Sequence, residues 1–254
     1  MYSSAVTAVK FHQANYYRSM SVTSKNNFIG DINKTISNSI NDIKYGGGVS
    51  DRHRRILSQL PEFVTIDWKN MIPSPPENDS EVTKKELRYI SRETAGLTPK
   101  EKKLVEVVDK DPFNAFKPFI EAMDIQFPVE KFKTAYRNSL RPVFVYLKHK
   151  YNRPRPFELA PEFNIDINRI VTDTHQSPAY PSGHTSYAAF LASMLSSLYP
   201  AYSDKFYSFA GDVGRARILQ GVHYPSDNNA AMLVGSAIWE DIKYKVLPDL
   251  EIKE

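Results

Sequence analysis

Three short stretches in the second half of the chain contain side chains that could hold a phosphate group and transfer it. They occupy residues 148–156, 181–184 and 217–227. A phosphoryl group in transfer spreads its negative charge over three oxygens, so catalysis depends on positioned cations. Arg155 and Arg217 can each present a planar fork to two of these oxygens, and Lys148 adds a point charge. These three side chains are predicted to bind the phosphate.

The second stretch combines a turn with the start of a helix. Ser182 and Gly183 are followed by a largely apolar segment at residues 184–191 that is typical of a helix opening. Backbone N–H groups at a helix start have no partner within the helix and point toward an anion. Gly183 has no side chain, so the backbone can approach the phosphate closely. We therefore expect the amides of Ser182 and Gly183 to complete the phosphate site.

Two histidines suit a division of labour in this chemistry. One imidazole must be neutral to attack phosphorus, and another must be protonated to donate to the leaving oxygen. Asp227 follows His223 by four residues and can accept its Nδ1–H, which would fix the tautomer and aim Nε2 at phosphorus. His223 is therefore predicted to be the nucleophile, Asp227 its orienting partner and His184 the general acid.

Two other interpretations of these residues stay open from the sequence alone. Asp227 precedes an apolar helical pattern at residues 228–243, so it could also cap that helix. His184, His223 and Asp227 could instead bind a metal, although no HExxH-like or cysteine-rich spacing supports this. We expect no metal in the site.

Taken together, the three stretches resemble the signature of the type 2 phosphatidic acid phosphatase superfamily, which includes bacterial class A acid phosphatases and vanadium-dependent haloperoxidases. The family pattern is Lys-x6-Arg-Pro, Pro-Ser-Gly-His and Ser-Arg-x5-His-x3-Asp. Every fixed position is matched except that Ala216 replaces the serine before Arg217. The resemblance covers about residues 140–235, and a proline-rich segment at residues 72–76 is also similar to the soluble acid phosphatases.

The resemblance implies a soluble phosphatase that hydrolyses phosphomonoesters, with diphosphates as a further substrate class, through a phosphohistidine and without a metal. Vanadate would inhibit it by mimicking the transition state. One alternative is a vanadium-dependent haloperoxidase, in which the same side chains hold vanadate as a prosthetic group. Another is a catalytically silent binding or assembly module that uses residues 1–60 as its contact surface. The presence of both histidines and of Asp227 argues against this last alternative.

The composition of the chain limits the partners it can have. Its 254 residues suffice for one domain, and a net charge of +4 suits a small phosphorylated substrate but is too small for a nucleic-acid-binding surface. There is no cysteine, so no disulfide framework can form. No apolar run is long enough to span a membrane, and the first twenty residues lack the apolar core of a signal peptide. These features favour a soluble, cytoplasmic protein and leave its oligomeric state open.

The helical signals in the sequence predict an all-α protein, because no segment alternates at the period of a strand. Residues 1–60 are interpreted as a partly helical N-terminal extension, with a helix near 32–43. Residues 61–254 are interpreted as the phosphatase domain, which begins with an extended, proline-containing linker over 61–80. Further helices are predicted at residues 98–110, 112–123, 129–140, 142–151, 184–198, 203–220 and 228–243. We expect a helical bundle of the phosphatase and haloperoxidase type, with the active site at helix ends.

The remaining histidines and one basic run carry no predicted catalytic role. His149 and His175 lie close to the motifs in sequence and are expected to support the site or to lie at the surface. His12 and His53 are expected to be structural or solvent-exposed. The basic run at residues 52–55 could touch an anion, but it is interpreted as a solvated face.

Overall fold

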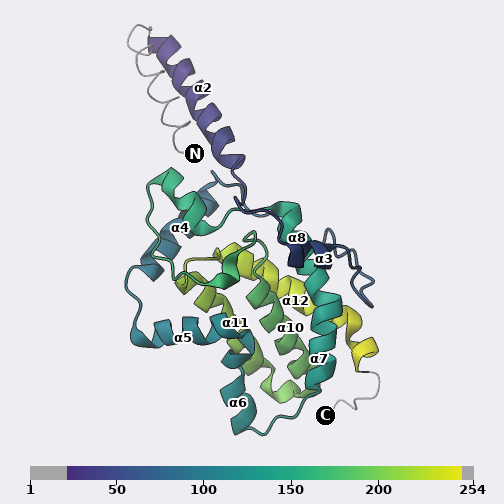
Figure 1. Ribbon diagram of the computed structural model, residues 1–254. Helices are drawn as coiled ribbons and strands as arrows, with labels where there is room; N and C mark the ends of the chain where they lie inside the picture. The colour runs from purple at the N-terminus through teal and green to yellow at the C-terminus, as the bar shows by residue number, and fades with distance from the viewer. Residues whose placement is uncertain (1–21, 248–254) are drawn as a thin grey trace.

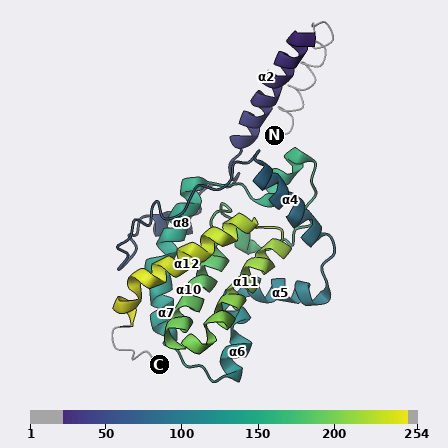
Figure 2. The ribbon, with the colours of Figure 1, turned by 180° about the vertical axis from the view of Figure 1, so that it is seen from behind.

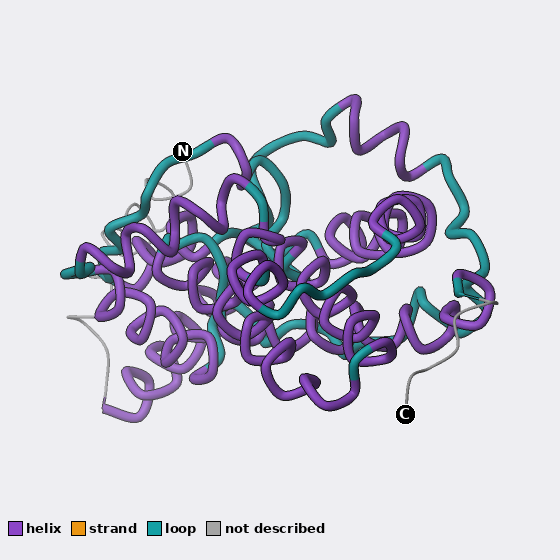
Figure 3. Tube along the Cα trace, turned by 90° about the horizontal axis from the view of Figure 1, so that it is seen from below, coloured by secondary structure: helices purple, strands orange, loops and turns teal. Residues whose placement is uncertain are grey.

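A computed structural model describes residues 22–247 of the chain, and this part contains helices and no strand (Figure 3). The all-α prediction is therefore confirmed. Predictions that concern residues 1–21, including the one for His12, lie outside the described residues. The α-helices are α2 (Val22–Asn41), α3 (Asp51–Leu57), α4 (Glu81–Thr94), α5 (Pro99–Lys110), α6 (Lys117–Ala122), α7 (Val129–Ala135), α8 (Arg141–Tyr151), α9 (Pro156–Leu159), α10 (Gly183–Leu198), α11 (Ser203–Leu219) and α12 (Pro225–Val246).

Helix α10 forms the centre of the bundle and packs against α11 and α12 (Figures 1 and 2). Its residues from Ala188 to Leu195 are all buried. Gly235 lies where α12 meets α10, and a side chain at this position would collide with the carbonyl oxygen of Ser186. The backbones of α10 and α12 are therefore in direct contact, which fixes the relative positions of the two helices that begin at the second and third motifs.

Helix α5 begins where the sequence predicts. Thr98 accepts a hydrogen bond from the backbone N–H of Glu101, and the Glu101 carboxylate accepts one from the N–H of Thr98 at 2.9 Å. This reciprocal capping satisfies two donors that the helix itself leaves free. Helix α5 packs against α11, so its last turn brings Asp109 to the C-terminal end of α11, beside Arg217.

The helices predicted at residues 112–123 and 129–140 are each interrupted. The first is a 3-10 turn at Pro112–Ala115 followed by α6, and the second is α7 followed by a π-helical turn at Tyr136–Leu140. Proline has no N–H, so Pro142 cannot donate to the carbonyl of Asn138 one turn earlier. The backbone N–H of Glu62 donates to that carbonyl instead, at 3.0 Å.

The segment at residues 61–80 contains turns but no helix and lies on the core, as its prolines predict. The backbone N–H and the hydroxyl of Thr65 each donate to the Asp241 carboxylate of α12 at 2.6 Å, and Ile72 is buried in the main core. Helix α2 extends away from the bundle in both ribbon views (Figures 1 and 2). Within residues 22–247, no helix combines the length and the apolar character that a membrane crossing requires.

Three helices, α3, α4 and the single turn α9, were not predicted from the sequence. Helix α4 places Leu87 and Ile90 in a second buried cluster, together with Ile40 from the end of α2. Helix α3 includes the basic run at residues 52–55, and it packs against α8 and buries Ile56 in the main core. Arg54 and Arg55 are exposed and lie outside the cavity lining, as a solvated face requires, whereas Arg52 is exposed but lines a cavity.

Candidate active site

The three motifs converge on one cavity of about 700 Å³. Each predicted residue stands at or next to a helix end: Lys148 in the last turn of α8, His184 in the first turn of α10, Arg217 in the last turn of α11, and His223 just before α12. This agrees with the predicted location of the site. The motif residues that line the cavity are Lys148, Arg155, Gly183, His184 and His223.

The third motif holds its histidine in one orientation. His223 is 2% exposed, and its Nδ1 lies 3.0 Å from Oδ2 of Asp227. The carboxylate can only accept, so Nδ1 carries the hydrogen and Nε2 presents its lone pair. That Nε2 lies 2.8 Å from a terminal nitrogen of Arg155, which agrees with the same tautomer. The geometry is the one that a nucleophilic imidazole requires.

Asp227 also stabilises the start of α12, although it is not the N-cap residue. Helix α12 begins at Pro225, so Asp227 is its third residue and Tyr224 is the N-cap. Oδ2 of Asp227 accepts a hydrogen bond from the N–H of Tyr224 at 3.0 Å, in addition to the bond from His223. One carboxylate oxygen therefore holds both the helix start and the imidazole.

The other oxygen of Asp227 is bound by Arg153, which the sequence did not single out. A terminal nitrogen of Arg153 lies 2.6 Å from Oδ1 of Asp227, and the other lies 3.2 Å from Glu86 on α4. The guanidinium also stacks 3.7 Å from the centre of the Tyr224 ring. Glu86 in turn accepts hydrogen bonds from the N–H and the hydroxyl of Ser226, at 2.6 and 2.9 Å. Arg153 thus joins two carboxylates in the interior, and Asp227 cannot rotate away from His223 without breaking this network.

Arg153→Met is expected to lower the free energy of unfolding by about 3–5 kcal/mol, because it leaves the buried Asp227 without its cationic partner. Urea denaturation would measure the change. Arg215→Gln is the matched control: Arg215 also contacts two carboxylates, Glu93 and Glu101, but it is 43% exposed, so its loss should cost less than about 1 kcal/mol. Equal destabilisation by the two substitutions would contradict a special role for the Arg153 network.

The two motif cations that line the cavity, Lys148 and Arg155, are buried and already hydrogen-bonded. Nζ of Lys148 donates to the carbonyl oxygens of Pro178 and Ala179 at 2.6 and 3.3 Å. Arg155 donates to the carbonyls of Ser177 and Val222, both at 2.8 Å. Burial, followed by the charge of neighbouring arginines, lowers the pKa of Lys148 well below its usual range and that of Arg155 to about 10. These cations crowd one another, so an anion bound between them would relieve their repulsion.

Arg217 lies behind the cavity wall and does not line it. It is 1% exposed, and its terminal nitrogens donate to Asp109 at 2.6 Å and to Thr174 at 3.1 Å. Burial raises the pKa of Asp109, but hydrogen bonds from Thr174 and Arg217 outweigh this and lower it to about 2. The guanidinium group of Arg217, which we expected to bind phosphate, is therefore hydrogen-bonded to Asp109 in this structure. Sequence reasoning missed Asp109 because it lies 108 residues before Arg217 in the chain.

The expected role of the Ser182 amide is not supported by the structure. The N–H of Ser182 donates to the backbone carbonyl of Asp227 at 3.1 Å, and Ser182 is fully buried outside the cavity lining. The side chain of Ser182 caps α10 by accepting from Thr185 N–H. Gly183 does line the cavity, and its N–H and that of His184 stand in the first turn, where a helix offers no internal partner. At this helix start, the backbone amides of Gly183 and His184 are therefore the ones that can bind an anion in the cavity.

His184 lines the cavity from the first turn of α10. Its Nε2 lies 3.5 Å from the backbone carbonyl of Asp109. Burial, followed by the positive charge of Arg217, lowers the pKa of His184 well below 6.5. Burial and the charge of Arg155 do the same to the pKa of His223. Both imidazoles are therefore neutral near pH 7, and a protonated His184 requires a nearby negative charge.

The other histidines lie beside the site. His53 on α3 lines the cavity, and its Nδ1 lies 2.8 Å from Nε2 of His149 on α8. His175 is buried, with its ring edge-on to Phe157. In residues 22–247, no group of three or more His, Cys, Asp or Glu side chains is arranged to hold a metal ion.

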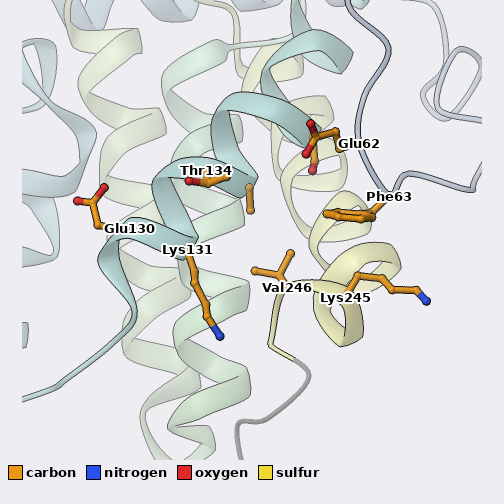
Figure 4. Close-up of a pocket in the computed structure, with 9 residues that line it drawn as sticks. Glu62, Phe63, Glu130, Lys131, Thr134, Lys245 and Val246 are labelled. Carbon is orange, nitrogen blue, oxygen red and sulfur yellow. The ribbon is translucent and has the colours of Figure 1, made fainter.

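A second cavity, of about 490 Å³, lies at the C-terminal end of α12 (Figure 4). It contains no histidine and no arginine, so it lacks the side chains that the chemistry above requires. Its lining residues are Glu62, Phe63, Glu130, Lys131, Thr134, Ala135, Ser139, Lys245 and Val246.

Comparison with known proteins gives matches in sequence and in fold. Residues 138–243 match the profile of the PAP2 superfamily. Non-specific acid phosphatases from Salmonella typhimurium (strain LT2) and Providencia stuartii are both 34% identical to this chain, over 91 and 92 residues. These alignments cover 35% of this chain and 35% and 36% of the two relatives, so the chain spans about a third of the length of the curated relatives it matches.

Solved structures with a similar fold include two bacterial haloperoxidases. A holo-type vanadium-dependent chloroperoxidase superposes with a TM-score of 0.58 at 13% identity, over 76% of this chain and 54% of that one. A vanadium-dependent iodoperoxidase gives a TM-score of 0.53 at 16% identity, over 74% and 55% of the two chains. At these identities the likeness concerns the fold. The sequence match at residues 138–243 and the likeness in fold therefore agree, and both point to the PAP2 superfamily as the family that this chain resembles.

Proposed function

We propose that this protein is a phosphatase that hydrolyses phosphomonoesters through a phosphohistidine on His223, without a metal ion. The observation that carries the proposal is the arrangement of His223: Asp227 holds its Nδ1, and its Nε2 contacts Arg155 in the cavity that Lys148 also lines. The acid phosphatases that match in sequence support the same reaction class. The haloperoxidases match in fold alone, so the phosphatase is the better supported activity.

The reaction proceeds in two balanced steps. A phosphate ester binds between Lys148, Arg155 and the amides of Gly183 and His184, and it takes over the Arg155 donor that contacts Nε2 of His223. The Nε2 lone pair then forms a bond to phosphorus while the ester P–O bond breaks, and His184 gives its proton to the leaving oxygen. His184, now neutral, accepts a proton from water as the water oxygen attacks phosphorus. The P–N bond breaks, His223 is regenerated, and inorganic phosphate is released.

The positive charge in the site stabilises the transferring group. Lys148 and Arg155 contact its oxygens directly, and Arg217 adds positive charge from behind the wall, with Asp109 fixing its position. Vanadate fits the same donor set, because it carries the charge and the oxygens of a transferring phosphoryl group. Bound vanadate would inhibit a phosphatase by mimicking its transition state, whereas in a haloperoxidase it would activate peroxide.

EDTA is expected to leave the rate of p-nitrophenyl phosphate hydrolysis unchanged, whereas orthovanadate should inhibit it strongly. The reason is that protein cations replace the charge that a metal would supply. A rate that collapses in chelator and returns with Mg²⁺ or Zn²⁺ would contradict the mechanism. Halide oxidation by peroxide after loading with vanadate, in a protein that does not hydrolyse the aryl phosphate, would establish the haloperoxidase instead.

The pH dependence is expected to be bell-shaped, with an optimum for kcat/KM on the acidic side of pH 6.5. His223 must be neutral and His184 protonated, yet the pKa of each lies well below 6.5 in the protein. Bound phosphate would add negative charge beside His184 and raise its pKa, so this group would keep its proton to higher pH in the complex. The alkaline limb of kcat should therefore lie at higher pH than that of kcat/KM. A flat profile from about pH 4 to 9 would show that one of the two imidazoles takes no part in the reaction.

A further inference from the structure

The active-site cavity extends along α8, well beyond the space needed for one phosphate. Arg141, Phe144 and Lys148 all line it, and their spacing of three and four residues places them on one face of the helix. Seven residues of α-helix separate the Cα atoms of Arg141 and Lys148 by about 10 Å. The cavity therefore has a cation at each end of this face, with Lys148 at the phosphate end and Arg141 at the other.

A second arginine reaches the far end of the cavity from a different helix. Arg52 on α3 lines the same cavity as Arg141. Helix α3 packs against α8, and the 2.8 Å contact between His53 and His149 joins the two helices one residue beyond Lys148. Burial lowers the pKa of Arg141 below its usual range. The interaction with Tyr136 acts in the opposite direction, and the like charge of Arg52 adds to the lowering. Both guanidinium groups therefore contribute positive charge to the wall of one cavity.

Within residues 22–247, no ion pair includes Arg52 or Arg141. The neighbouring cation, Lys110, is by contrast paired with Glu106 at 3.1 Å. The acidic neighbour at this end is Asp111, and its carboxylate accepts the N–H of Phe113 at 2.9 Å to cap a 3-10 turn. Two guanidinium groups that line one cavity and form no ion pair can both donate hydrogen bonds to a phosphate bound there.

We propose that Arg52 and Arg141 form a second anion subsite, which selects substrates whose leaving group carries a second phosphate several ångströms from the transferred one. This inference rests on the proposed function, because it assigns the leaving group of the same reaction. The wall between the two ends includes Phe144 and Tyr187, so the part of the substrate that joins the two phosphates meets aromatic side chains. A bisphosphate on a short carbon scaffold fits this description, and the adjacent phosphates of pyrophosphate do not reach both ends.

The test compares butane-1,4-diol bisphosphate with 4-hydroxybutyl phosphate. Binding is measured by titration calorimetry in the His223→Ala background, where the ligands are not consumed. After correction for the two equivalent ends of the bisphosphate, we expect its Kd to be at least about tenfold lower than that of 4-hydroxybutyl phosphate. This is the effect expected of one additional charge-assisted hydrogen bond. Arg141→Gln and Arg52→Gln should each remove most of this preference, and added salt should reduce it.

Two matched controls separate the subsite from general surface charge. Arg137 lies near Arg141 and Arg55 lies on α3, but neither lines the cavity, so Arg137→Gln and Arg55→Gln should keep the preference for the bisphosphate. Arg52 is exposed, so its replacement should not disturb folding even if that of Arg141 does. Equal affinity for the two ligands, or an equal loss in the control variants, would overturn the subsite. Hydrolysis of 4-hydroxybutyl phosphate by the unmodified protein decides the proposed function separately.

Discussion

Replacing His223 with alanine is expected to lower kcat/KM for every phosphate ester by about four orders of magnitude or more. The substitution removes the atom that forms the bond to phosphorus, and no neighbouring side chain can take its place. His184 lies on another helix, and within residues 22–247 no carboxylate holds its Nδ1 as Asp227 holds that of His223. Initial rates with p-nitrophenyl phosphate and with an alkyl phosphate would measure the loss.

His149→Asn is the matched control for this substitution. His149 lies on α8, one residue from Lys148, but it does not line the cavity, and its ring contacts His53 instead. The variant should retain activity within about tenfold of the unmodified protein, because it removes an imidazole that is not in contact with the reacting atoms. Losses of the same size in the two variants would show that His223 has no special place in the reaction.

The second large effect is expected from His184→Ala, and its size should depend on the leaving group. An alkyl phosphate leaves as a strongly basic alkoxide that needs a proton, so its hydrolysis should fall by about 10²–10⁴-fold. The phenolate of p-nitrophenyl phosphate leaves without assistance, so its release should suffer far less. Burst-phase kinetics would follow the p-nitrophenolate released in the first turnover separately from the steady state.

This variant should also accumulate phosphoenzyme from the aryl ester, because His184 is proposed to activate water in the second step. The ratio of the two rate losses is the informative quantity, since a merely structural defect would lower the hydrolysis rates of both substrates equally. Equal losses on the alkyl and aryl esters would contradict the role of His184 as a general acid.

Several parts of the site could be predicted because their signals are local in sequence. The bond between His223 and Asp227 follows from their four-residue spacing at a helix start. The boundary of α5 follows from the pair Thr98 and Glu101, which cap the helix reciprocally. The position of Lys148 in the last turn of α8 follows from the proline-rich residues that end this helix. In each case the interacting groups lie within one or two helical turns of each other.

Other parts depend on contacts between distant segments. Asp109 meets Arg217, and Glu86 meets Arg153, only after α4 and α5 have packed against the rest of the bundle. No residue spacing encodes these pairs. The amide of Ser182 is likewise unavailable to phosphate because of the distant carbonyl of Asp227.

Helix α4 is a different case, because its signal was present in the sequence. Thr83, Leu87, Ile90 and Thr94 are buried at spacings of four, three and four residues, and Ser80 stands at the N-cap. This is the pattern of an amphipathic helix with a polar cap. The many charged residues between these positions obscured a short apolar stripe that contains only two strongly hydrophobic side chains.

The central claim is the covalent bond between phosphorus and His223, and trapping it is the most direct test. The protein would be mixed rapidly with an aryl phosphate, quenched in alkali, where phosphohistidine survives, and digested for mass spectrometry. The mechanism predicts an acid-labile phosphate on His223 in the unmodified protein, more of it in His184→Ala, and none in His223→Ala. Phosphate on another residue, or hydrolysis with no phosphoenzyme in either the unmodified protein or His184→Ala, would contradict the mechanism.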